Sequence, residues 1–367
     1  MKKILPLFAM LIISKAIFAQ LTVPPYGGNK KAMVGERIGI TDVTIHYDRP
    51  GVKGREGKIW GELIPAGFNY LGFGPAKEAP WRAGANENTT IEFSTDVLVN
   101  GKKLPAGKYG FFVVYNPNEC TLIFSKNNNS WGSYFYDQKE DVLRVQTKPL
   151  ALNESHEWLE YAFTKQKENS AEVDLSWEKL KIPFTVEVDL NTTQLESFRN
   201  ELRTEKGFSW NAWDQAAKWC LEKNINLEQA LQWSDTATSP IFGGDRDLSA
   251  WSTKAQILSK LGRTTEADAI MKNALPFANE FQLHQYGIEL LKAKKLKEAM
   301  EIFKTNYTAH PNSFAANMGM ARIHSAMGNY EDAMKYVNDA LKIAPNDNSK
   351  KSLEGMIEKL KNKKDIN

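Results

Sequence analysis

The sequence predicts a protein of two domains, an antiparallel β-sandwich or barrel followed by an α-solenoid of paired helices. Two observations support this class. Between residues 34 and 189, short apolar runs alternate with turn residues and no helical pattern intervenes. After residue 190, apolar and small residues recur at helical spacing instead. With 367 residues, the chain is long enough for each domain to have its own core.

The strand pattern recurs in short segments through the first domain. They are 37–40, 43–47, 89–94, 97–99, 108–115, 121–126, 142–147, 158–163, 171–177 and 184–188. The first two flank a turn at Thr41-Asp42. Asn100-Gly101 follows 97–99 and predicts a two-residue hairpin, because both central residues of such a turn take positive φ. Alternating apolar residues in 171–177 and 184–188 indicate one buried face and one exposed face.

A repeat organises the helical half. Ala299 and Ala333 are 34 residues apart (333 − 299), and so are Pro311 and Pro345 (345 − 311). This spacing, with small residues in register, resembles the tetratricopeptide repeat, in which paired helices stack on one another. We expect such repeats over 209–346, with a divergent first pair at 209–236, and a capping helix and tail over 347–367 that frays near its Lys-rich end. The resemblance implies a protein partner docked on the repeats.

The first residues have the pattern of a secretory signal over 1–19. Lys2 and Lys3 precede an apolar run from Ile4 to Ile13, and small residues follow up to Ala19. We expect cleavage after Ala19 and a periplasmic or secreted mature protein; an uncleaved membrane anchor is the alternative. Elsewhere no apolar run is long enough to span a bilayer, so no membrane span is expected in the mature form.

Composition excludes several kinds of partner and cofactor. The formal net charge of +3 is too small to predict nucleic-acid binding. The five His residues and two Cys residues have no metal-ligand spacing, so neither a metal nor another cofactor is predicted. Cys120 lies in a strand-like run and Cys220 on a helical face, which favours two isolated buried thiols over a disulfide.

The richest stretch for a site is 46–87, where Gly residues alternate with charged and aromatic ones in segments that read as loops. The candidate ligand-binding residues are Arg49, Lys53, Arg55, Trp60, Trp81, Arg82, Asn86 and Glu87. No dinucleotide-binding or other cofactor motif is complete here.

Several motifs resemble one known family. They read YDRPGVKGR, IWGELIP, WRAGANENTTIEFSTDVLVNGKKLPAGKYGFF, WGSYFYDQKEDVLRV and LSWEKLKIPFTVEV, and they span about 34–189. They are similar to the exported domain-of-unknown-function family numbered 2911. The resemblance implies export and a domain boundary, and it supplies no activity.

Three interpretations of the 46–87 stretch remain open. In the first, the Trp residues plug one end of the sandwich and Arg82 pairs with Glu87 as an internal clamp. In the second, Arg49, Arg55 and Arg82 hold an anion while Trp60 or Trp81 stacks on a flat ligand face such as a sugar ring. In the third, His46, Asp48 and Glu87 act as acid and base.

The sequence therefore favours an exported binding or scaffold protein over an enzyme. In this hypothesis the repeats dock a protein partner, and the β-domain holds an anionic or carbohydrate ligand. The alternative is a cell-envelope hydrolase that uses the 46–87 cluster. It requires His46, Asp48 and Glu87 to share a pocket, because acid and base must reach one substrate bond.

Overall fold

A computed structural model describes residues 28–72 and 74–367. The expected signal sequence, residues 1–19, lies outside the described residues. The chain divides into two compact units, one ending at Gln194 and the other comprising Leu195–Asn367.

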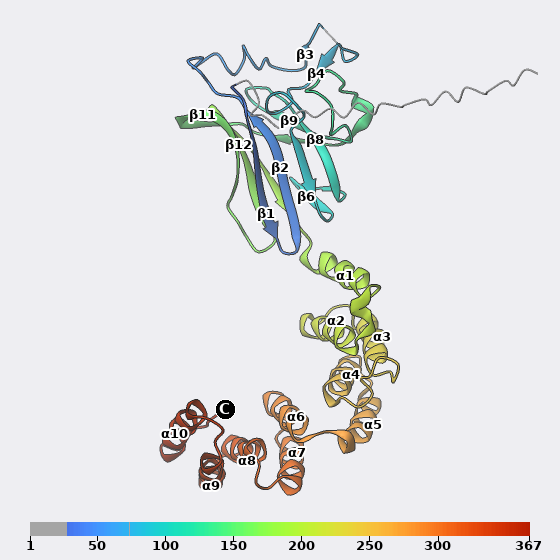
Figure 1. The fold of residues 1–367 in the computed structure, drawn as a ribbon, viewed down its shortest axis with the longest axis vertical. Coiled ribbons are helices and arrows are strands. Elements are labelled where there is room, and N and C mark those ends of the chain that lie inside the picture. The colour runs from blue at the N-terminus through green and yellow to red at the C-terminus, as the bar shows by residue number, and fades with distance from the viewer. Residues whose placement is uncertain (1–27, 73) are drawn as a thin grey trace, which may run out of the picture. The chain divides into compact units, whose positions relative to one another are not determined.

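The first unit consists of antiparallel strands in two main sheets (Figure 1). One sheet has the order β1 (Lys30–Ile38), β2 (Thr41–Arg49), β5 (Thr90–Phe93), β8 (Gly107–Val114), β9 (Cys120–Ser125) and β10 (Asp141–Thr147). The other has the order β11 (Leu150–Thr164), β12 (Ser170–Glu187), β6 (Val97–Val99) and β7 (Lys102–Leu104). A small third sheet pairs β3 (Asn69–Tyr70) with β4 (Glu78–Ala79).

The two main sheets share one hydrophobic core. Phe111 of β8 and Phe124 of β9 both contact Phe184 of β12, with ring centroids 5.5 and 6.1 Å apart. Two sheets that bury their inner faces against each other form a sandwich rather than a barrel. The alternating residues predicted to point inward, from Ala171 to Trp177 and from Phe184 to Val186 on β12 and Val188 just after it, are all buried.

Two strand predictions were wrong in detail. Segments 171–177 and 184–187 belong to one strand, β12, although Pro183 and the polar residues between them suggest a break. The turn between β1 and β2 is Gly39-Ile40 rather than Thr41-Asp42, because Ile38 pairs with Thr41 and Gly39 takes the positive φ of 60°. The hairpin at Asn100-Gly101 is confirmed, with φ of 46° and 76°.

The helical half begins with α1 (Leu190–Glu201), which spans the division between the units. Four helix pairs follow among the described residues: α2 (Trp210–Lys223) with α3 (Leu227–Ala237), α4 (Leu248–Lys260) with α5 (Thr264–Ala274), α6 (Glu280–Lys292) with α7 (Leu296–Ala309), and α8 (Phe314–Ala326) with α9 (Tyr330–Lys342). Helix α10 (Asp347–Lys361) packs on α9. Short 3-10 turns are present at Gln138–Glu140, Glu205–Phe208 and Leu275–Phe277.

The 34-residue spacing has a simple structural basis. Ala299 of α7 and Ala333 of α9 are both fully buried, each on the second helix of its pair. Small residues at these positions let neighbouring helices approach closely. None of the helices in the described part of the chain is long and apolar enough to cross a membrane.

The prediction that the C-terminal tail frays was wrong. Ile366 is buried, and the Ser325 hydroxyl donates a hydrogen bond of 2.7 Å to Asp365. The side-chain amide of Asn367 donates to the Arg322 carbonyl at 3.0 Å. These contacts fasten the tail to α8. Both cysteines are free and buried, as predicted.

Candidate functional site

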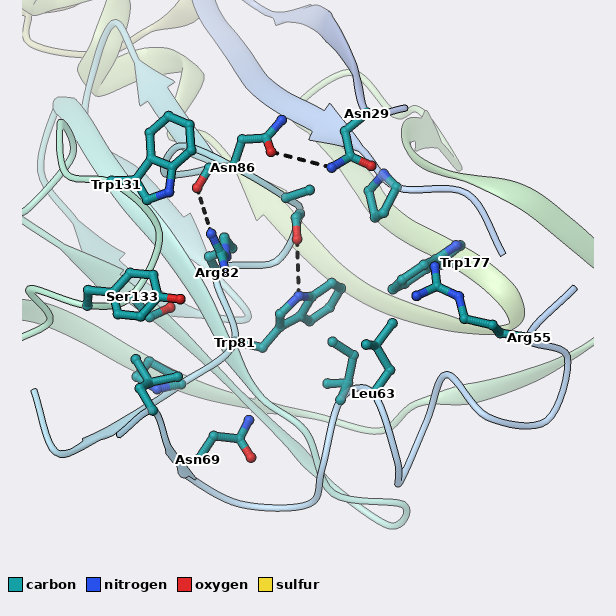
Figure 2. A pocket seen from close by; sticks show the side chains of 17 residues that line it. Asn29, Arg55, Leu63, Asn69, Trp81, Arg82, Asn86, Trp131, Ser133 and Trp177 are labelled. Carbon is teal, nitrogen blue, oxygen red and sulfur yellow. Dashed lines mark hydrogen bonds between the residues drawn. The ribbon is translucent and has the colours of Figure 1, made fainter. Parts of the chain in front are cut away.

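A cavity of about 410 Å³ lies in the first unit among the loops that contain most of the candidate residues (Figure 2). Arg55, Trp81, Arg82 and Asn86 line it together with Trp177 of β12. Asn29, Asn69 and Ser133 add polar groups to the wall, and Leu63 and Trp131 add apolar ones. The cavity therefore combines cationic, amide and aromatic groups, as small-molecule sites commonly do.

The indoles of Trp81 and Trp177 form one side of the cavity, and Trp60 packs against Trp81 without lining the cavity itself. Trp81 is stacked on Trp177 with centroids 6.1 Å apart and planes at 19°, and Trp60 meets Trp81 edge-on at 5.5 Å. The Trp60 Nε1–H donates to the Trp177 carbonyl and the Trp81 Nε1–H donates to the Gly84 carbonyl, each at 3.2 Å. The backbone of Trp81 also pairs with Val113 of β8. These contacts hold the indole wall in a fixed position.

Arg82 carries one of the two guanidinium groups among the residues that line the cavity, the other being that of Arg55. Its Nη1 donates to the Asn86 carbonyl at 2.7 Å, and its guanidinium lies 5.9 Å from the centre of the Tyr134 ring. The backbone at Gly132 approaches the guanidinium so closely that a Cβ there would overlap it. Within the described part of the chain, no carboxylate forms an ion pair with Arg82. Burial lowers the pKa of this guanidinium, with the nearby Tyr134 acting in the opposite direction.

Residues 29–186 match a family model described as a protein of unknown function (DUF2911). The resemblance inferred from the sequence motifs is confirmed, and this unit is called the DUF2911 domain below. Residues 248–275 and 290–357 match two tetratricopeptide repeat models.

Solved structures of tetratricopeptide repeat proteins resemble part of the chain. One, a tetratricopeptide repeat protein from Parabacteroides merdae ATCC 43184, is 18% identical with a TM-score of 0.30, covering 47% of this chain and 70% of that one. Another, YrrB, described as having an unusual peptide-binding site, is 17% identical with a TM-score of 0.27, covering 47% of this chain and 87% of its own. At such scores the likeness carries nothing about ligands. No curated protein matches the sequence.

The clamp expected between Arg82 and Glu87 is not formed. Glu87 instead accepts from the Lys31 Nζ of β1 at 2.5 Å, in an exposed ion pair. Arg82 reaches a backbone carbonyl of the same loop rather than an acidic side chain. The Arg82 guanidinium is therefore not neutralised by Glu87, the residue that the clamp interpretation assigned to it.

The other predicted cationic residues have structural partners in the DUF2911 domain. Arg49 donates through Nε to the Leu159 carbonyl at 2.8 Å and forms an ion pair of 3.5 Å with Glu160. The Arg55 guanidinium donates to the carbonyls of Val52 and Gly51 at 2.9 and 2.7 Å, which fastens its own turn. Neither Arg49 nor Lys53 lines the cavity, so the three arginines do not surround one patch.

A second cavity, of about 370 Å³, is lined by His46, Asp48 and Glu87. Asp48 is buried, and its Oδ1 has no hydrogen-bond partner among the described residues. Burial raises the pKa of Asp48, while a hydrogen bond with the Asn86 side chain acts in the opposite direction. No group of His, Cys, Asp and Glu side chains in the described ranges is arranged to hold a metal ion.

Sequence reasoning missed several residues of the first cavity, notably Asn29, Trp131 and Trp177. A signal existed for Trp131, because a Trp that follows the polar run Asn127-Asn128-Asn129-Ser130 in a loop is not explained by core packing. Trp177 gave no such signal, since it fits the alternating pattern of a buried strand face.

Proposed function

We propose that this chain is an exported binding protein in which the DUF2911 domain holds a small ligand and the helical repeats dock a protein partner. The observation that carries the ligand half is Arg82, a partly buried cation in a cavity with an indole wall and no acidic partner among the described residues. Burying a charge without an opposite charge is costly, and an anionic ligand group would offset that cost.

The scaffold half rests on the repeats. Two tetratricopeptide models match the helical unit, and its pairs α4–α5, α6–α7 and α8–α9 follow one another with short connections. Stacked helix pairs of this kind present extended surfaces that protein partners use. The repeats support a protein-interaction scaffold.

The hydrolase alternative is the weaker of the two functions. His46, Asp48 and Glu87 do line one cavity, as that alternative requires. However, the Glu87 carboxylate is in an ion pair with Lys31, and general acid–base chemistry needs a pair of groups free to exchange protons with one substrate. Binding requires no such pair.

A thermal-shift screen of the mature full-length chain against small sugars, organic acids and phosphates tests the ligand half. A ligand that binds only the folded state raises the melting temperature with its concentration. We expect stabilising compounds for the wild type whose effect is lost in Arg82→Ala. A screen in which no compound stabilises the wild type, or in which Arg82→Ala responds equally, would contradict the proposal.

Export is tested separately, by the mass of the mature N-terminus. The proposal predicts a chain that begins at Gln20 and is recovered from periplasmic or secreted fractions without detergent. A retained Met1, or recovery only with detergent, would refute it.

A further inference from the structure

The loop from Arg82 to Glu87 directs its carbonyl groups toward donors of the protein itself. The Ala83 carbonyl accepts from the Thr89 hydroxyl at 3.2 Å and from the Tyr161 hydroxyl at 2.7 Å. Both donors belong to buried side chains. The Gly84 carbonyl accepts from the Trp81 indole. These two carbonyls are therefore occupied.

Two backbone N–H groups of the same loop, those of Gly84 and Ala85, have no such hydrogen-bond partner among the described residues. In a trans peptide, the C=O of one residue and the N–H of the next point in opposite directions, and every described peptide here is trans. Since the Ala83 and Gly84 carbonyls face the donors named above, the N–H groups of Gly84 and Ala85 face away from those donors. Among the described residues none accepts a hydrogen bond from either amide. Both residues line the first cavity.

A third unpaired donor belongs to the same cavity. The Trp177 side chain is only 1% exposed, and its Nε1–H has no acceptor in the described part of the chain. A buried donor without an acceptor costs about 1–3 kcal/mol. With Arg82, the cavity thus holds an excess of donors, and it lacks a carboxylate of its own among its described lining residues.

Next to this donor set is an exposed ring. Trp131 lines the cavity and is 55% exposed, whereas Trp81 and Trp177 are buried. It immediately precedes Gly132, whose backbone touches the Arg82 guanidinium, and Figure 2 shows its indole on the same side of the cavity as Arg82 and Asn86. A ligand ring stacked on Trp131 would therefore have its substituents within reach of Arg82.

We propose that the ligand of the first cavity is a carboxylate attached to a ring, with the carboxylate held by Arg82 and the Gly84 and Ala85 amides and the ring stacked on Trp131. This inference rests on the proposed ligand-binding function and narrows its substrate class. Guanidinium and backbone N–H groups both donate to carboxylate oxygens in strong charge-assisted hydrogen bonds. Acidic sugars and aromatic acids share this chemistry, and indole faces accept both kinds of ring.

Calorimetric titration of the mature full-length chain with two matched pairs of compounds tests the inference. The pairs are glucuronate with glucose and benzoate with benzamide. We expect at least one acid to bind about tenfold or more tightly than its neutral partner, and the pair that does so distinguishes a sugar from an aromatic acid. Arg82→Ala should abolish that preference and Trp131→Ala should weaken acid binding by a similar factor.

Arg37→Ala is the matched control, because it removes the same charge from an exposed surface pair with Asp42. It should leave acid binding unchanged. If Arg82→Ala does not fold, as judged by circular dichroism, the acid preference of the wild type and the Trp131→Ala variant still decide the matter. Equal binding of acids and neutral partners, or no binding of either acid, overturns the inference. Stabilising neutral compounds in the thermal-shift screen would at the same time preserve the broader ligand function.

Discussion

At the scale of single residues, the effect of substituting Arg82 on stability distinguishes a ligand site from an internal clamp. Its side chain bonds the Asn86 carbonyl and the ring face of Tyr134, and no described carboxylate depends on it. Removing one hydrogen bond from a charged donor costs about 1.5–3 kcal/mol, whereas removing one partner of a buried ion pair costs about 3–5 kcal/mol.

We therefore expect Arg82→Ala to lower the free energy of unfolding by about 1.5–3 kcal/mol, measured by urea denaturation of the ligand-free mature protein. Arg49→Ala is a useful comparison, because Arg49 joins the Leu159 carbonyl and Glu160 across the sandwich. A loss above about 3 kcal/mol for Arg82→Ala would mean that the residue is a clamp after all.

A second residue-scale prediction concerns pH and Asp48. Burial raises the pKa of this carboxyl, so the folded state binds its proton more tightly than the unfolded state does. The stability associated with that proton is fully present below the ordinary pKa of an Asp and is lost as the pH rises through the raised value. Asp48→Asn keeps a neutral side chain and removes this dependence.

The stability of the wild type relative to Asp48→Asn should therefore fall as the pH is raised from about 3 toward neutrality. Denaturation curves of both proteins at a series of pH values measure the difference. A difference that stays constant, or that changes in favour of the wild type as the pH rises, would contradict the assignment of a raised pKa to Asp48.

Part of the candidate site could be predicted from residues alone. Trp81, Arg82 and Asn86 lie within one loop between β4 and β5, so local composition was enough to single them out. Arg49 was grouped with them only because it is near in sequence, and its strand directs it to Glu160 instead. Trp177 comes from a distant strand, and only the pairing of the sheets brings it to the cavity.

At the scale of elements, helices α6, α7 and α8 pack closely where two glycines face one aromatic ring. Gly287 of α6 and Gly319 of α8 are both so close to Phe303 of α7 that a Cβ on either would overlap the ring. Phe303 is fully buried and has little room to move. The close packing of these three helices therefore depends on the absence of two side chains.

Gly287→Ala and Gly319→Ala should each lower the stability by about 1–2 kcal/mol, because overpacking a core outweighs the better helix propensity of Ala. Gly355→Ala in α10 is the matched control, since a Cβ there meets nothing within 4 Å. It should raise the stability by up to about 1 kcal/mol. The prediction is that the change in stability has opposite signs at the two packed glycines and at the control. Thermal unfolding that shows stabilisation by all three substitutions would refute the packing account.

Helices, strands and turns were predicted well where their formation depends on residues adjacent in the sequence. Asn100-Gly101 forms its hairpin because the turn chemistry depends on those two residues alone. The joining of 171–177 with 184–187 could not be foreseen, because β12 continues through Pro183 only by pairing with β11 on one side and β6 on the other. The anchored tail likewise depends on Ser325, which is remote in sequence.

At the scale of the whole molecule, each unit has its own core. The core of the sandwich is built from residues of the first unit, including Leu190 at the start of α1, and the cores of the helical unit are built from residues 195–366. The change of periodicity near residue 190 was sufficient to predict this division.

Residues 20–194 and 195–367 should therefore fold separately. The first fragment should give a β-type circular dichroism spectrum and melt cooperatively, and the second should give a helical one. Aggregation of the first fragment, or a melt without cooperativity, would show that the helices complete its core.

The central claim is that the two units bind different things, and affinity capture from cell-envelope extracts tests it most directly. The baits are the mature chain, its Arg82→Ala variant, and the two fragments once their folding has been verified. We predict that one protein is captured by the mature chain, by Arg82→Ala and by residues 195–367, and not by residues 20–194. Capture of that protein by residues 20–194 alone, or its loss in Arg82→Ala, would contradict the account.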